Sequence, residues 1–191
     1  FKAVSEGNRQ IKGIAVVTVL FVVVVLAVVL WVRMTTPKWI IPTELPSNSP
    51  ILTNAWVIDG DTIDATRRSG EKVRIRILGI DAPEIAHSPT PADCGGDAAK
   101  TALIRLVDGK TVTITTDPGV GEKDQYGRVL AYVSIGGIAD VGLRLVQDGM
   151  VAAWHPASEP EPTRYASYVV AQDAARTAGK GSWPTCGTLG R

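Results

Sequence analysis

An apolar segment near the N-terminus separates this chain of 191 residues into two unlike parts. Residues 14 to 32 form an unbroken run of nineteen apolar or uncharged residues in which Thr18 carries the only hydroxyl. A helix of this length matches the roughly 30 Å hydrocarbon core of a bilayer. Lysine and arginine flank the run on both sides, with a modest excess before it, which favours a cytoplasmic N-terminus. We therefore expect a cytoplasmic segment over residues 1–13 and a transmembrane signal anchor over residues 14–34, with the remainder of the chain outside the cell membrane.

The same run also resembles the apolar region of a cleaved signal peptide. Such regions usually span about 7–15 residues and end at small residues that a peptidase recognises. The run here is longer and ends in Leu30, Trp31 and Val32, which favours the uncleaved anchor. Secretion after cleavage stays open as the alternative.

A change of composition follows the apolar run. Residues 35–50 are rich in Thr, Pro and Ser and contain four prolines. Proline excludes this stretch from a helix interior or a central strand and favours an extended tether. Residues 51–191 are then expected to form one domain.

The expected domain has the pattern of a small barrel. Strand-like, β-branched stretches cover residues 55–58, 62–66, 72–80, 111–115 and 129–135. Apolar residues at helical spacing predict helices over residues 97–107, 140–147 and 163–177. Short strands with interspersed helices indicate an α+β fold: a five-stranded β-barrel of the oligonucleotide-binding (OB) type with three α-helices, preceded by the single transmembrane helix.

The charge of the expected domain excludes nucleic-acid binding by bulk electrostatics. Residues 51–191 contain fifteen Lys and Arg against seventeen Asp and Glu, a balance of −2. Proteins that bind nucleic acid through the electrostatic field of the whole molecule carry a clear excess of Lys and Arg over Asp and Glu. Positive charge in this domain must therefore act locally.

Two acidic motifs lie where predicted strands end. Asp59 and Asp61 stand between the first and second strands, and Asp81 and Glu84 follow the third. If these strands are neighbours, Asp61 and Asp81 converge. With the backbone carbonyl of Ala82 they would offer oxygen ligands alone, which select Ca²⁺ or Mg²⁺.

Two arginines complete this set of charged residues. Arg76 lies five residues before Asp81, on the predicted strand that leads to it, and Arg128 lies in a separate glycine-containing loop. Guanidinium groups from different elements can grip a phosphate and stabilise the extra charge of its transition state. Taken alone, Asp59 in a turn or Arg76 on a solvated strand face is structural. Together with a carboxylate able to take a proton, the set predicts cleavage of a phosphodiester.

Four segments in order carry a family resemblance: residues 57–62, 76–84, 124–132 and 145–149. They resemble the staphylococcal (micrococcal) nuclease family, also called thermonucleases, and the similarity spans residues 53–183. The resemblance implies an enzyme with a five-stranded barrel and three helices, and we expect the protein to be a monomer. It also implies Ca²⁺-dependent hydrolysis of DNA and RNA to 3′-phosphate products.

The resemblance also assigns roles to single residues. The proposed site residues are Asp61, Asp81 and the carbonyl of Ala82 as calcium ligands, Asp59 behind them, Arg76 and Arg128 on the phosphate, Glu84 as general base, and Tyr126 on the substrate. The role of the glutamate in this family is debated, so the resemblance places Glu84 in the site more firmly than it assigns Glu84 the role of general base.

Three positions depart from the family pattern. Ala82 stands where the family commonly has Thr, which a main-chain ligand tolerates, and Gln125 stands where it often has Lys. The loss of that charge is expected to weaken nucleotide binding without removing catalysis. The family's later pocket tyrosines do not map cleanly onto residues 152–155, where Trp154 either stacks on a base or packs as a buried or loop indole.

The two cysteines, Cys94 and Cys186, predict a disulfide, because a pair in an exported chain is most simply oxidised. Two unrelated buried thiols are the alternative. His87 and His155 are isolated in sequence and are expected to be surface or loop histidines.

Two other function classes compete with an enzyme. One is a non-catalytic nuclease-like module that binds nucleic acid or a protein partner, and the other is a membrane-tethered structural protein. Degenerate modules of this kind typically lack the acids and arginines. This chain retains them, which favours the enzyme.

Overall fold

The computed structural model describes residues 26–27 and 50–190. The chain divides into two units, residues 1–40 and 41–191, and only Leu26 and Ala27 of the first are described, both helical. The anchor expected over residues 14–34 and the tether expected over residues 35–50 otherwise lie outside the described residues, except for Pro50. Among the residues described, no helix combines the length and apolarity needed to cross a membrane.

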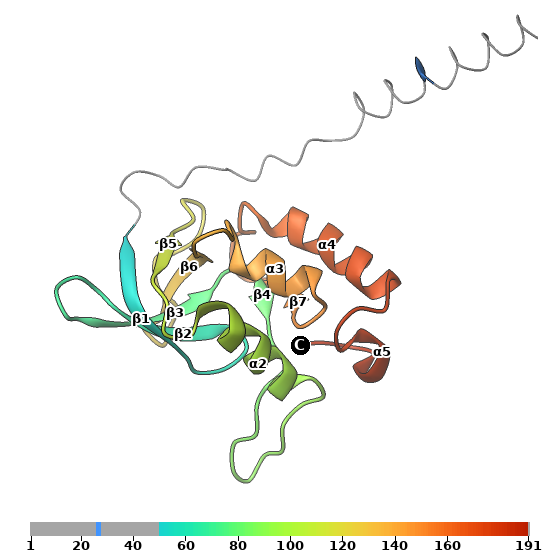
Figure 1. The fold of residues 1–191 in the computed structure, drawn as a ribbon, viewed down its shortest axis with the longest axis horizontal. Helices are drawn as coiled ribbons and strands as arrows, with labels where there is room; N and C mark the ends of the chain where they lie inside the picture. Colours follow the sequence, from blue (N-terminus) through green and yellow to red (C-terminus); the bar gives the residue numbers. More distant parts are fainter. Residues whose placement is uncertain (1–25, 28–49, 191) are drawn as a thin grey trace, which may run out of the picture. The chain divides into compact units, whose positions relative to one another are not determined.

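The second unit contains the expected five-stranded barrel, which is closed (Figure 1). Its strands are β1 (Ile51–Val57), β2 (Thr62–Thr66), β3 (Lys72–Ile77), β5 (Val112–Thr115) and β6 (Val129–Ser134). They follow one another around the barrel in the order β1, β2, β3, β6 and β5. The pair β3 and β6 is parallel, and every other barrel pair is antiparallel.

The strands form where side chains alternate between the barrel interior and solvent. In β3, Val73, Ile75 and Ile77 are buried, whereas Lys72 and Arg74 are exposed. This period of two is the signature of a half-buried strand. Strand β6 is buried along its whole length.

Helices cover the barrel on one side (Figure 1). They are α2 (Gly96–Val107), α3 (Val141–Gln147), α4 (Tyr165–Thr177) and the short α5 (Trp183–Cys186). Helix α2 contacts β1 and α3, and α3 contacts both β6 and α4. The carboxylate of Asp140 begins α3 by accepting a hydrogen bond from the N–H of Leu143 at 2.9 Å. Helices α2, α3 and α4 confirm the three helices predicted from the sequence, and α5 was not predicted.

The strand predicted over residues 72–80 is interrupted, which corrects the sequence analysis. Strand β3 ends at Ile77, and a turn with Gly79 at φ +77° leads into β4 (Ile80–Asp81). A Cβ at Gly79 would lie 3.0 Å from ring carbons of Tyr168, so glycine suits both the backbone angle and the space. Strand β4 pairs with β7 (Ala152–Ala153), which the sequence analysis missed. Strand β1 also begins earlier than expected, at Ile51.

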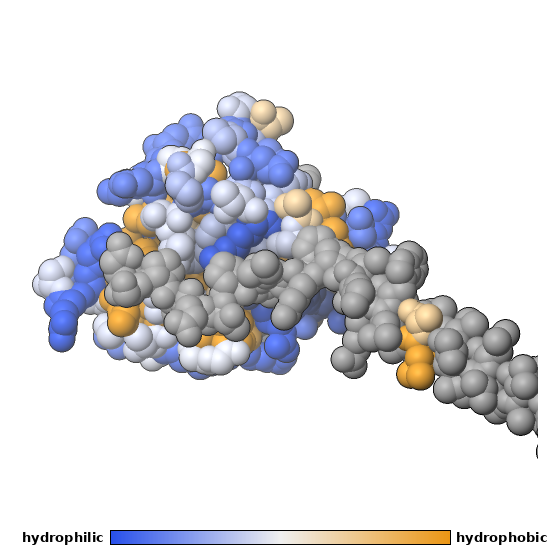
Figure 2. Space-filling view, turned by 90° about the horizontal axis from the view of Figure 1, so that it is seen from above, coloured by the Kyte–Doolittle hydropathy of each residue, from blue (hydrophilic) through white to orange (hydrophobic). Residues whose placement is uncertain are grey.

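The buried residues form one large core and one small satellite. The large core consists mainly of buried side chains from the barrel strands and from α2 and α3, together with Tyr168 of α4. The satellite consists of Ala152, Ala175, Trp183 and Leu189, so it joins β7 and α4 to the C-terminal residues. On the face shown in Figure 2, hydrophilic residues predominate and hydrophobic patches are small.

Candidate active site

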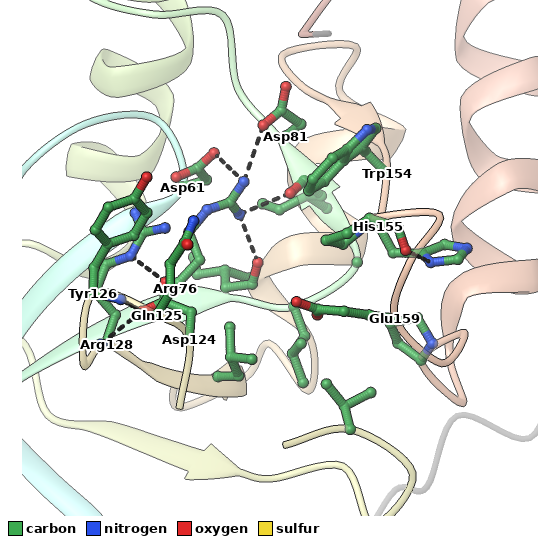
Figure 3. Close-up of a pocket in the computed structure, with 18 of the residues that line it drawn as sticks. Asp61, Arg76, Asp81, Asp124, Gln125, Tyr126, Arg128, Trp154, His155 and Glu159 are labelled. Carbon is green, nitrogen blue, oxygen red and sulfur yellow. Dashed lines mark hydrogen bonds and ion pairs between the residues drawn. The ribbon is translucent and has the colours of Figure 1, made fainter. Parts of the chain in front are cut away.

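A cavity of about 520 Å³ opens beside the turn between β3 and β4 (Figure 3). Most of the site residues expected from the sequence line it: Asp59, Asp61, Arg76, Asp81, Glu84, Tyr126 and Arg128. Ala82 is not among the lining residues, but it is buried and its N–H donates to Asp61, which does line the cavity. Residues far apart in the chain therefore share one concave surface.

Arg76 lies between the two buried carboxylates. Its Nη2 is 3.0 Å from Oδ2 of Asp61 and 3.0 Å from Oδ1 of Asp81, and Figure 3 shows the guanidinium between them. Only 11% of the Arg76 side chain is exposed, so this residue does not lie on a solvated strand face. The convergence of Asp61 and Asp81 follows from the pairing of β2 with β3 and from the turn after β3.

Arg76 also holds the turn that presents Asp81. Its Nη1 donates hydrogen bonds to the carbonyl oxygens of Ile77, at 2.9 Å, and Ile80, at 2.7 Å. Charge-assisted hydrogen bonds of this kind are stronger than neutral ones. Loss of Arg76 would therefore disturb the local backbone as well as the charge of the site.

Asp61 is held by neighbours on both of its oxygens. Oδ2 accepts from the N–H of Ala82 at 3.0 Å, and Oδ1 accepts from the hydroxyl of Thr62 at 2.9 Å. The backbone N–H of Asp61 donates to Oδ1 of Asp59 at 3.0 Å. Burial raises the pKa of Asp61 to about 7, against the lowering effect of Arg76, and the charge of Asp59 adds to the rise.

Arg128 is oriented by Asp124, a residue to which the sequence analysis gave no role. Nε of Arg128 lies 2.6 Å from Oδ2 of Asp124, and Oδ1 accepts from the backbone N–H groups of Arg128 and Tyr126, both at 2.9 Å. Burial raises the pKa of Asp124, but hydrogen bonds from Arg128 outweigh it and the pKa is lowered. An Asp four residues before an Arg, around the turn at Gly127, was the available signal.

Tyr126 and Arg128 form one wall of the cavity (Figure 3). Cζ of Arg128 lies 5.4 Å from the ring centroid of Tyr126, within cation–π range. Nη1 of Arg128 lies 3.5 Å from the hydroxyl of Thr62, the residue after Asp61. Tyr126 is 75% exposed and is available to a ligand.

Glu84 has a fixed backbone and an exposed side chain at the cavity. Its N–H donates to Oδ2 of Asp93 at 3.3 Å, and its carbonyl accepts from the N–H of Asp93 at 2.9 Å. The backbone of Glu84 is therefore held in place, and the residue is exposed at the cavity.

The opposite wall comes from the segment after β7 and includes Trp154, His155 and Glu159 (Figure 3). The N–H of Trp154 donates to the carbonyl of Gly79 at 2.9 Å, which ties this wall to the turn before Asp81. His155 packs edge-on against Tyr165 with ring centroids 4.5 Å apart. His155 lies in a loop, as expected, and it also lines the cavity.

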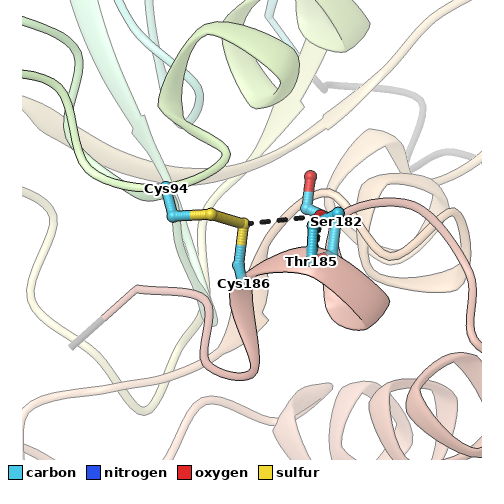
Figure 4. The surroundings of a disulfide bond; sticks show 4 residues. All are labelled: Cys94, Ser182, Thr185 and Cys186. Atoms are coloured by element: carbon cyan, nitrogen blue, oxygen red, sulfur yellow. Dashed lines mark hydrogen bonds between the residues drawn. A yellow bond between two sulfur atoms is a disulfide. The ribbon is translucent and has the colours of Figure 1, made fainter.

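The predicted disulfide between Cys94 and Cys186 is present (Figure 4). The two Cα atoms are 5.5 Å apart, and the bond links residues 92 positions apart in the chain. It joins the loop before α2 to the end of α5, and neither cysteine lines the cavity.

The acidic residues suit a hard cation in part. Within residues 26–27 and 50–190, no group of three or more His, Cys, Asp or Glu residues has the arrangement of a metal site. Two buried carboxylates do converge on one cationic nitrogen, each at 3.0 Å. Calcium takes oxygen ligands that include main-chain carbonyls and water, so these carboxylates fit an ion whose remaining ligands are of those kinds.

Comparison with known proteins agrees with this geometry. The family model described as staphylococcal nuclease homologue matches residues 74–185, more than half of the chain. A thermonuclease of Staphylococcus intermedius is 35% identical over 97 residues, which cover 51% of this chain and 55% of the relative. A probable endonuclease LCL3 of Arthroderma otae is 32% identical over 118 residues, which cover 58% of this chain and 40% of the relative.

A third relative has been given no function. It is an uncharacterized protein of Bacillus anthracis, 44% identical over 80 residues, which cover 42% of this chain and 36% of the relative. The chain thus spans between about a third and a little over half of the length of these relatives. The matched family domain, together with the closed barrel, confirms the resemblance seen in the motifs. The chain belongs to the family of staphylococcal nuclease homologues.

Proposed function

We propose that this protein is a nuclease that hydrolyses phosphodiester bonds of DNA and RNA in a Ca²⁺-dependent reaction that leaves 3′-phosphate ends. The observation that carries the proposal is the meeting of Asp61, Asp81, Arg76 and Arg128 at one cavity. The thermonuclease and the probable endonuclease among its relatives support nuclease activity.

The charged residues divide the work of this reaction. Asp61, Asp81 and the carbonyl of Ala82 are the proposed ligands of Ca²⁺, which when bound would neutralise negative charge on the phosphate. Arg76 and Arg128 bind the phosphate oxygens, since guanidinium groups pair with them in two hydrogen bonds. Two cationic donors also stabilise the added charge of the five-coordinate transition state.

Glu84 is the proposed acceptor of the proton from the attacking water. The water oxygen forms a new bond to phosphorus, the bond from phosphorus to O5′ breaks, O5′ takes up a proton from solvent water to become a hydroxyl, and the phosphate stays on the 3′ side. Glu84 is an exposed residue that lines the cavity, which supports the role of a base that acts on a water molecule. Tyr126, exposed on the same wall as Arg128, is proposed to contact the substrate.

The domain is further proposed to act outside the cell membrane as a monomer. The apolar run of residues 14–32 supports a membrane anchor, and a disulfide is typical of exported proteins. Release by cleavage of the N-terminal segment remains the alternative to an anchor.

The decisive experiment uses the full chain, solubilised in detergent, with a plasmid and an RNA as substrates. Cleavage is expected with Ca²⁺ and not with EGTA, and the product ends should carry 3′-phosphate. Glu84→Ser and Arg128→Ala should each abolish cleavage without changing the melting temperature. Arg74→Ala is the matched control, because Arg74 pairs with Asp64 at 2.7 Å and does not line the cavity.

One observation favours the rival module that binds without cutting. The guanidinium of Arg76 is already engaged by two carboxylates and two carbonyls. If the purified protein binds nucleic acid but leaves both substrates intact at saturating Ca²⁺, the binding module is correct. If it neither binds nor cuts, the membrane-tethered structural protein is favoured.

A further inference from the structure

The C-terminal residues after α5 lie directly against Asp81. The described chain ends at Gly190, close to α2 and α5 (Figure 1). A Cβ added to Gly190 would lie 2.7 Å from Oδ2 of Asp81 and 3.0 Å from its carbonyl oxygen. Real Cβ atoms essentially never approach within 3.0 Å of another heavy atom. Any side chain at this position must therefore displace either the carboxylate or the tail.

Two anchors hold these residues in place. Leu189 is 3% exposed and packs in the small core with Ala152, Ala175 and Trp183. Cys186, three residues earlier, packs against the same core and is joined to Cys94. Ala152 is also the β7 partner of Asp81, so the anchor and the carboxylate are attached to the same short strand pair.

The two oxygens of Asp81 are therefore bounded by different elements. Oδ1 accepts from Nη2 of Arg76 at 3.0 Å, whereas Oδ2 faces the backbone of Gly190. The terminal torsion of an aspartate is broad and not confined to narrow wells. The contacts of Arg76 with Oδ1 and of Gly190 with Oδ2 restrict this torsion in Asp81.

We propose that Leu189 and Gly190 are positioning residues that set the direction of the Asp81 carboxylate and thereby the strength with which this site holds Ca²⁺. The inference rests on the proposed function, in which Asp81 is a calcium ligand. Leu189 supplies the anchor, and Gly190 supplies a backbone without a side chain beside Oδ2. Partners that orient metal ligands typically contribute 10–100-fold to metal affinity.

The test compares Gly190→Ala with Gly187→Ala in the full chain. Both glycines have a positive φ, +70° at Gly190 and +71° at Gly187, so alanine is strained by the backbone at both positions. A Cβ at Gly187 meets nothing within 4 Å, whereas at Gly190 it meets Asp81. Calcium affinity is measured by titration calorimetry without nucleic acid, and melting temperature is measured without calcium.

Gly190→Ala is expected to weaken Ca²⁺ binding by about 10–100-fold, while Gly187→Ala retains the original affinity and both variants melt alike. Equal affinities of the two variants would overturn the inference and leave the metal site standing. A wild-type chain that takes up no Ca²⁺ would overturn the proposed metal site and the inference with it.

Leu189→Ala provides a second variant if alanine at Gly190 prevents folding. It removes the anchor without placing any atom beside Asp81. Measured well below its melting temperature, it should also bind Ca²⁺ more weakly than the wild type. Unchanged affinity in Leu189→Ala would contradict the positioning role.

Discussion

Oδ2 of Asp124 lies 2.6 Å from Nε of Arg128, so the arginine expected to bind phosphate is itself held by a carboxylate four residues earlier. The same aspartate accepts two backbone N–H groups of the turn. It therefore fixes both the direction of the guanidinium and the shape of the loop that carries it.

Asp124→Asn should lower kcat/KM for nucleic acid by about tenfold to a hundredfold. The substitution removes the charge from a hydrogen bond that is worth about 1.5–3 kcal/mol, and 1.4 kcal/mol corresponds to a factor of ten. Steady-state cleavage of a labelled oligonucleotide measures the change. Asp64→Asn is the control, because Asp64 makes a comparable pair with Arg74 that does not line the cavity. If Asp64→Asn lowers kcat/KM by the same factor, the loss does not depend on the contact between Asp124 and Arg128 at the cavity.

Gly60 allows the first acidic motif to pack against α2. A Cβ on this residue would lie 2.5 Å from Cβ of Ala82 and 2.8 Å from Cβ of Ala99. Overpacking of this kind costs about 1–3 kcal/mol, so Gly60→Ala should lower the free energy of unfolding in urea by that amount. Gly136→Ala, with open space around its Cβ, should lie within about 0.5 kcal/mol of wild type. An unchanged free energy of unfolding in Gly60→Ala would mean that α2 can move away from residue 60 without cost.

The barrel was predictable because its strands carry their own signal. In β3 the alternation of Arg74 and Arg76 with buried neighbours reveals a strand from local sequence alone. The meeting of Asp61 and Asp81 was likewise foreseeable from the ends of strands expected to be neighbours. Cys94 and Cys186 could be paired because the chain contains no other cysteine.

The rest required the folded chain. Strands β4 and β7 have two residues each and α5 has four, too few to show a period. The contact of Gly190 with Asp81 joins positions more than a hundred residues apart, and no local pattern encodes it. Ala82 stays a predicted metal ligand through its carbonyl, and the fold adds a contact that no local pattern encodes, from its N–H to Oδ2 of Asp61 at 3.0 Å.

Asp117 is a buried carboxylate that joins the barrel to the segment before α4. It accepts hydrogen bonds from the hydroxyl of Tyr132, from the N–H and hydroxyl of Thr163, and from the N–H of Gly119. Burial raises the pKa of Asp117, but these four donors outweigh it and the pKa lies below its usual value. Burial and the same contact raise the pKa of Tyr132 to about 12.

Asp117→Asn should lower the free energy of unfolding at pH 7 by about 2 kcal/mol, since it weakens hydrogen bonds to a charged group. A depressed pKa stabilises the fold above the unfolded-state value near 4 and loses that contribution as pH falls through the folded-state value. The difference between wild type and variant should therefore shrink from pH 7 to pH 3 in urea titrations. Asp173→Asn, on the exposed face of α4, is the control and should show no such change. If the difference in free energy of unfolding between wild type and Asp117→Asn stays constant with pH, the stabilisation does not come from the charge of Asp117.

Reduction of the disulfide between Cys94 and Cys186 should destabilise the domain by up to about 4–5 kcal/mol. The bond closes a loop of about ninety residues and restricts the unfolded chain accordingly. The double variant Cys94→Ser, Cys186→Ser should match the reduced wild type in urea unfolding and should not respond to reductant. Because the bond also anchors the residues before Leu189, calcium affinity should fall in the reduced protein while the barrel still melts cooperatively. Reduction that lowers stability but leaves calcium affinity unchanged would separate the two roles and assign the disulfide to stability alone.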